Sequence, residues 1–199
     1  MDTVTDRRSR DERLYHIAEQ QAGYFTTAQA KEAGFNSPQL TYHVGKGRFI
    51  RVRWGVYRLA LYPASPHEDL FVAWLQAGPD AVISHDSALA LYELSDALPA
   101  RIHITVPRTS SRRRPDVALH TNRLDAADTT WVAGLPVTTV SRTIADVASG
   151  GMDAEQVVMA VNQAIDRGLV DRVDLECYAV TRGGRPQRLI RNALREGAR

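Results

Sequence analysis

The spacing of apolar residues along the first part of the chain predicts two helices in succession. Residues 11–21 carry apolar side chains three and four positions apart, which is the spacing of one helix face. Thr26 and Gln29 form the pattern of a capping box, in which each residue caps the other at the start of a helix. Gly34 ends this second, short helix, because glycine readily leaves the helical conformation.

The third predicted element is a helix with a polar outer face. We expect Ser37 to cap its first amides, Pro38 to take the first helical position and Gly47 to end it. Leu40 and Val44 lie four positions apart and should face inward. The exposed face is then expected to carry Gln39, Tyr42, His43 and Lys46.

After Gly47 the period of the pattern changes from 3.6 to 2, which predicts a small hairpin over residues 48–59 with its turn at Trp54. Arg51 and Arg53 lie on its outer face, so the hairpin is basic. Three helices followed by a hairpin, with a tight glycine turn between the second and third, is the order of a winged helix-turn-helix.

The charge of this region indicates a nucleic-acid partner, because residues 37–59 contain no Asp or Glu. We expect the third helix to enter the major groove of double-stranded operator DNA. The residues expected to face the bases are Gln39, Thr41, Tyr42 and His43. Those expected to face the phosphates are Lys46, Arg48, Arg51 and Arg53. Trp54 would reach the sugar-phosphate edge or simply pack, and the alternative for the whole region is an ordinary solvated basic face.

The rest of the chain predicts a second domain of mixed helices and strands, so the fold class is α+β, with domains over residues 1–62 and 63–199. Residues 81–83 and 102–106 read as strands, and residues 117–121 as the hairpin partner of the second one. The net charge of +2 is unevenly distributed, since residues 61–99 hold no Lys or Arg and residues 124–180 hold nine acids against three. Such blocks indicate faces with different partners.

Two basic segments of the second domain have open roles. The loop between the predicted strands contains three consecutive arginines that either follow a nucleic-acid backbone or serve solubility: Arg112, Arg113 and Arg114. A helix over residues 186–195 places Arg188, Arg191 and Arg195 on one face. A solvated surface is the favoured interpretation there, and contact with DNA is the alternative.

The sequence contains few candidates for catalysis or for a metal or cofactor. The motifs GxGxxG, GxxxxGK[ST], GxSxG and HExxH are absent, which argues against an enzyme that depends on them. Residues 84–87 (SHDS) contain triad residue types, but neighbours at a strand-to-helix junction point in different directions, so capping is the favoured role. His85, His103 and His120 would converge if the strands pair, although such histidines are usually hydrogen-bonded structural residues. We expect no metal and no cofactor.

Two sets of residues resemble the AbiEi-type antitoxins, over about residues 20–170. In the first domain they are residues 23–30 (GYFTTAQA), Gly34, 40–44 (LTYHV) and 47–58 (GRFIRVRWGVYR). In the second they are residues 83–91 (ISHDSALAL) and 134–146 (GLPVTTVSRTIAD). The resemblance implies a transcriptional autorepressor that also neutralises a nucleotidyltransferase-like toxin encoded beside it. Some longer relatives continue into a nuclease-like domain, and we do not carry that activity over to this chain.

Arg142 and Asp146 belong to the last of these stretches and leave two interpretations open. They lie four apart on a predicted helix, which is the spacing of a plain intrahelical ion pair. As part of the family pattern they would instead be toxin-facing or catalytic.

Two other functions remain alternatives at this stage. One is an enzyme that silences the toxin by covalent modification such as phosphorylation, but the chain lacks a glycine cradle or clustered carboxylates for a nucleotide and metal. The other is a DNA-binding regulator whose second domain senses a small ligand. The N-terminus has no apolar signal segment and no long apolar run follows, so we expect a cytoplasmic protein with no membrane contact.

Overall fold

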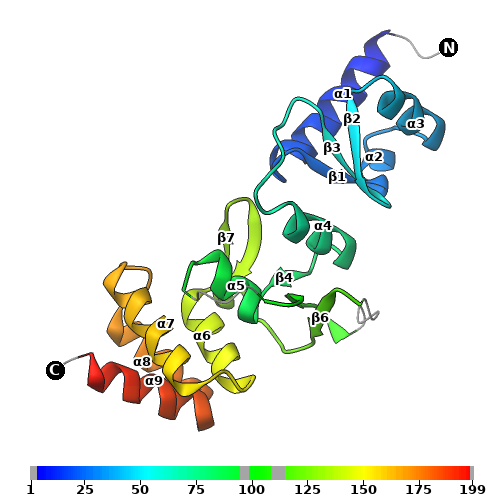
Figure 1. Cartoon of the computed structure of the whole chain (residues 1–199). Helices are drawn as coiled ribbons and strands as arrows, with labels where there is room; N and C mark the ends of the chain where they lie inside the picture. The colour runs from blue at the N-terminus through cyan, green and yellow to red at the C-terminus, as the bar shows by residue number, and fades with distance from the viewer. Residues whose placement is uncertain (1–3, 95–98, 109–114, 198–199) are drawn as a thin grey trace. The chain divides into compact units, whose positions relative to one another are not determined.

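The computed structural model describes residues 4–94, 99–108 and 115–197, and these form two compact units (Figure 1). The first unit runs to Pro79 and also includes Ala133–Leu135, and the second comprises Asp80–Val132 and Pro136–Arg199. The domain boundary expected between residues 62 and 63 stays a prediction. The compact first unit continues beyond it through one further helix.

The first unit combines helices with a small antiparallel sheet. Its elements are, in order, α1 (Val4–Glu19), β1 (Tyr24–Thr26), α2 (Thr27–Glu32), α3 (Ser37–Gly45), β2 (Phe49–Arg53) and β3 (Val56–Leu59). The strand order is β1-β3-β2, and β3 pairs antiparallel with both neighbours. The predicted winged helix-turn-helix is confirmed, with β1 as an added strand too short for its pattern to be read.

Apolar side chains from every one of these elements form a single core. Leu14 of α1, Phe25 of β1 and Leu40 of α3 are almost fully buried in it together with Phe49 of β2. Gly23 makes room at its edge: its φ is +88° and a Cβ there would lie 2.4 Å from the Cβ of Tyr62. Only glycine fits this position without displacing the tyrosine.

The start of α3 differs from the prediction by one residue. Asn36, rather than Ser37, is the N-cap, and its side chain accepts a hydrogen bond from the backbone N–H of Gln39 at 2.9 Å. The Gln39 side chain in turn accepts from the backbone N–H of Asn36 at 2.9 Å, which completes a capping box. Both Asn and Ser are good caps, so the spacing to a capping-box partner decides between them. The capping box predicted at Thr26 and Gln29 is confirmed.

The helix α4 (Glu68–Ala77) packs on the β1 strand of the first sheet. Tyr24 stacks on Phe71 with ring centroids 4.9 Å apart, and its hydroxyl donates to Glu68 at 2.8 Å. This contact explains why the first unit extends to Pro79.

The second unit contains a mixed sheet in the order β6-β5-β4-β8-β7. Its strands are β4 (Val82–Ile83), β5 (Ile102–Thr105), β6 (Val117–His120), β7 (Thr129–Val132) and β8 (Leu135–Thr138). β5 and β6 run parallel, so the hairpin predicted for these segments is wrong. The alternation of side chains that predicts a strand is the same in both directions, so it cannot fix the direction of pairing.

Helices make up the remainder of the second unit: α5 (His85–Leu91), α6 (Val140–Ser149), α7 (Ala154–Asp166), α8 (Arg172–Arg182) and α9 (Gly184–Glu196). α6 packs against α5, α7, α8 and α9, so it is the central helix of this layer. All residues of α6 except Ser141 and Ser149 are buried, and the buried set includes both Arg142 and Asp146.

Candidate nucleic-acid interface

The exposed face of α3 presents three of the residues predicted to meet DNA. Thr41, Tyr42 and Lys46 are exposed. Lys46 lies with its Nζ 5.7 Å from the Tyr42 ring centroid, which is a cation–π contact at the end of the helix. The hydroxyl of Thr41 donates to the carbonyl of Ser37 within the helix at 3.2 Å. The face is therefore polar at its start and cationic at its end.

Gln39 has a structural role that the pattern did not reveal. It is half-buried, and its side-chain oxygen already accepts the capping hydrogen bond from Asn36. A bidentate contact with adenine uses both the oxygen and the amide N–H of a glutamine. In this geometry the NH₂ group is the part of Gln39 best placed to meet a base, and a fully bidentate contact would compete with the helix cap.

His43 lies in the core and not on the exposed face, so that expectation is corrected. Its exposed fraction is 3%, and its ring packs against Phe35 and Phe49 at centroid distances of 5.6 and 4.9 Å. The reason is spacing: His43 follows Leu40 by three residues and therefore shares its inward face. Arg48 also approaches His43, with 3.3 Å between Nη1 and Nδ1.

The hairpin of β2 and β3, which we call the wing, carries exposed cations on its outer side. Arg51 and Arg53 are both exposed, and Arg53 lies 3.8 Å from Asp69 in a largely solvated ion pair. Arg48 pairs with Asp11 of α1 at 3.0 Å, with 46% of its side chain exposed. Solvated pairs of this kind contribute little stability, so both arginines can exchange a carboxylate for a phosphate at small cost.

Arg58 does not belong to this surface. It is buried, its guanidinium donates to the carbonyl of Tyr62, and it lies 3.9 Å from Glu68. Arg112, Arg113 and Arg114 lie outside the described residues, so their predicted DNA contact stays a prediction.

In the second unit Arg142 and Asp146 are buried and form the intrahelical ion pair that their spacing suggests, and the toxin-facing role stays a prediction. Each has 1% of its surface exposed, and Arg142 Nε donates to Asp146 Oδ2 at 2.8 Å. Arg142 Nη1 also donates to Asp128 at 2.9 Å, and Arg182 lies 3.3 Å from Asp146. These contacts give the two side chains a structural role within the second unit.

The ionic network extends to Tyr178, whose hydroxyl donates to Asp128 Oδ1 at 2.6 Å. Burial alone raises the pKa of Asp128, but the hydrogen bond from Tyr178 and the charge of Arg142 outweigh it, so the pKa lies below its usual value. Burial and the bond to Asp128 raise the pKa of Tyr178. The sequence did not indicate Asp128, Tyr178 or Arg182 as partners, because they are distant from Arg142 in sequence.

The three histidines of the second unit converge, although β5 and β6 pair parallel and not as the hairpin on which this expectation rested. The rings of His85 and His120 stack at a centroid distance of 3.5 Å, and His120 Nε2 lies 3.2 Å from His103 Nδ1. Burial lowers the pKa of His85 to about 3 and that of His120 to about 4, so both are neutral at pH 7. Across the described ranges, no group of three or more His, Cys, Asp or Glu side chains is arranged to hold a metal ion.

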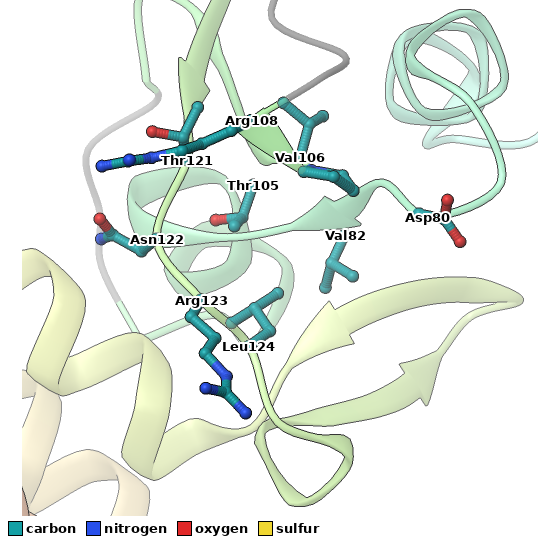
Figure 2. A pocket seen from close by; sticks show the side chains of 10 residues that line it. Asp80, Val82, Thr105, Val106, Arg108, Thr121, Asn122, Arg123 and Leu124 are labelled. Atoms are coloured by element: carbon teal, nitrogen blue, oxygen red, sulfur yellow. The ribbon is translucent and has the colours of Figure 1, made fainter.

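A pocket of about 620 Å³ lies where β5 and β6 end in the second unit (Figure 2). The polar lining residues include Thr105, Arg108, Thr121, Asn122 and Arg123, and Val82, Val106 and Leu124 are apolar lining. Figure 2 shows the guanidinium of Arg123 pointing away from Arg108, so the two cations do not converge on one point.

Comparison with known proteins identifies both parts of the chain. Residues 12–60 match the family described as transcriptional regulator, AbiEi antitoxin, and residues 81–196 match the AbiEi antitoxin C-terminal domain. The crystal structure of the RV2827C protein from Mycobacterium tuberculosis has a similar fold, with a TM-score of 0.54 and 16% identity over 94% of this chain and 77% of that one. No curated protein matches the sequence significantly.

None of the helices in the described ranges has the length and apolar character needed to span a bilayer. The two family matches occur in the order expected from the fold, a winged helix-turn-helix followed by a mixed sheet with helices. The chain belongs to the AbiEi antitoxin family and combines a transcriptional-regulator domain with an AbiEi C-terminal domain.

Proposed function

We propose that this antitoxin represses its own operon by binding double-stranded operator DNA through α3 and the wing. In the proposed complex α3 lies in the major groove, with Thr41, Tyr42 and the amide of Gln39 toward the bases. Lys46, Arg48, Arg51 and Arg53 bind the phosphates on either side. The observation that carries the proposal is the exposed cationic surface of residues 37–59, a segment without an Asp or Glu.

We further propose that the second domain neutralises a nucleotidyltransferase-like toxin encoded by the adjacent gene. The family membership supports a cognate toxin, and the acidic segments of residues 80–99 and 124–180 give this part of the chain a different charge from the wing. Antitoxin activity would then depend on surfaces of the second unit and not on the cations of the first.

A test in cells uses the full chain and separates the two activities. The variant Lys46→Ala/Arg51→Ala/Arg53→Ala should lose repression of a reporter under its own promoter and should still rescue growth when the adjacent gene is expressed. The matched control removes two exposed cations of α9, Arg188→Ala/Arg195→Ala, and should keep repression. Repression by the triple variant at the parental level would refute DNA binding by this surface. Failure of the parent chain to rescue growth would refute the toxin proposal.

The mode of neutralisation is read from the toxin itself. Direct binding predicts a stable complex that co-purifies with unmodified toxin. A mass increase of the toxin that depends on the antitoxin and ATP would instead assign the protein to the modifying enzymes.

A second candidate function, ligand-sensing regulation, is favoured by the pocket beside β5 and β6. Its volume of about 620 Å³ falls within the range of small-molecule sites, and it lies beyond the carboxyl ends of two parallel strands. A ligand that raises the melting temperature and changes operator affinity would support this function. Asn122→Trp, which enlarges an exposed side chain of the pocket lining, should abolish both effects.

A further inference from the structure

The tip of the wing exposes a tryptophan that the fold holds in place. Trp54 has an exposed fraction of 83%, although tryptophan side chains are usually largely buried in folded proteins. Beside it the pairing of β2 and β3 shifts register between Arg51 and Arg53, which is a bulge that redirects the side chains after it. Gly55, with φ at +76°, completes the turn.

The backbone of the tip is anchored from two helices of the first unit. The N–H of Thr27, at the start of α2, donates to the carbonyl of Gly55 at 3.0 Å. Gln76 of α4 donates to the carbonyl of Trp54 at 3.2 Å. These bonds fix the position of the turn while the indole projects outward, so its exposure does not arise from a loose loop.

Arg51 covers one face of the indole and leaves the other open. The Arg51 guanidinium carbon lies 4.6 Å from the Trp54 ring centroid, which is a cation–π contact. The tip therefore presents a flat apolar surface next to a positive charge. A sugar-phosphate strand has the complementary chemistry, since the apolar face of a deoxyribose adjoins a phosphate.

The wing is long enough to reach a sugar-phosphate strand at the rim of the major groove. β2 has five residues, which span about 17 Å in a strand. The major groove is about 12 Å wide, so a wing that starts just after a helix in the groove extends past its rim.

We propose that the open face of Trp54 packs on the sugar edge of the duplex DNA, next to the phosphate that Arg51 binds. This inference rests on the proposed function, in which the first unit binds duplex DNA. Because sugar edges are the same in every sequence, the contact contributes affinity and position but no base preference. It also involves no ion release, so it should not change the dependence of binding on salt.

The test measures binding of fluorescent duplexes by anisotropy, one duplex from the chain's own promoter and one of random sequence. Trp54→Ala should bind both about tenfold more weakly with an unchanged salt slope, the effect expected for losing about half an indole of buried apolar area. Arg51→Ala should instead reduce the magnitude of the slope by about 0.9. Trp54→Phe keeps an apolar ring and should lose less than about threefold.

Tryptophan emission reports the contact directly. DNA should quench the emission of the parent, and this change should disappear in Trp54→Phe but persist in Trp131→Phe, which removes another exposed indole. If the parent binds DNA without a DNA-dependent change in emission, and Trp54→Ala binds equally well, this inference is wrong and DNA binding stands. If the parent binds neither duplex, the proposed function itself fails and the inference with it.

Discussion

Replacement of Arg142 by alanine tests whether the buried ionic network stabilises the second unit. The guanidinium makes hydrogen bonds to Asp146 at 2.8 Å, to Asp128 at 2.9 Å and to the carbonyl of Arg123 at 3.0 Å. Its removal leaves the Asp146 carboxylate, whose side chain is fully buried, with Arg182 as its remaining cation. A buried charge that loses a partner costs about 3–5 kcal/mol, because its desolvation is no longer compensated.

The expected result is a large loss of thermal stability for one particular arginine. At about 4 °C per kcal/mol for a unit of this size, Arg142→Ala should lower Tm by about 12–20 °C. The matched control is Arg123→Ala, because the Arg123 side chain is 90% exposed and pairs with the exposed Asp125. That variant should change the free energy of unfolding by less than about 1 kcal/mol.

Calorimetry or circular dichroism of the purified full chain gives the comparison. A Tm for Arg142→Ala within about 3 °C of the parent would refute the stabilising role. Arg142→Lys keeps the charge but loses the planar fork, so we expect an intermediate loss. A lysine variant with parental Tm but no toxin neutralisation would instead support a toxin-facing role at this position.

Three further predictions concern pH, a glycine and the α3 cap. Burial lowers the pKa of His85 to about 3 and that of His120 to about 4, below the 6.5 of an unperturbed histidine. Between about pH 4 and 6.5 the unfolded chain therefore binds more protons than the folded chain, so Tm should fall as the pH drops through this range. A constant Tm there would contradict the lowered pKa values of these histidines. In chemical denaturation Gly23→Ala should destabilise the first unit by about 2–5 kcal/mol. Gly47→Ala should cost only about 1–2 kcal/mol, because its added Cβ meets no atom within 4 Å. Equal losses would mean that backbone strain alone determines the cost of both substitutions. Gln39→Glu keeps the capping oxygen and should change the free energy of unfolding by less than about 0.5 kcal/mol. The variant should nevertheless show a smaller preference for operator over random DNA, because it loses the amide N–H groups. An unchanged preference would assign Gln39 to the cap alone.

The order of elements in the first unit was predictable because strong local signals agree with the tertiary fold. Thr26 and Gln29 form the expected capping box, and the change of period after Gly47 marks the wing. His43 was predicted to be exposed because histidine is polar, and its spacing of three residues from the buried Leu40 received less weight. The spacing was the better guide, since side chains three positions apart share a helix face.

The second unit was less predictable because its arrangement depends on contacts between distant residues. The alternating pattern of β5 and β6 identified both strands and carried no information about their parallel pairing. The network around Arg142 joins α6 to Tyr178 and Arg182 of α8, a helix that was not predicted from the sequence. Only the tertiary fold brings these charges together, so the sequence left the role of Arg142 and Asp146 open.

The most direct test of the central claim is the salt dependence of promoter binding by the full chain. Anisotropy titrations over a range of salt concentrations give the slope of log K against log salt. Each of Lys46→Ala, Arg51→Ala and Arg53→Ala should lower the magnitude of this slope by about 0.9, because each removes one phosphate contact and its released ion. The exposed α9 cation Arg188, changed to alanine, should leave the slope unchanged. Parental slopes in all three wing and helix variants would contradict DNA binding through α3 and the wing.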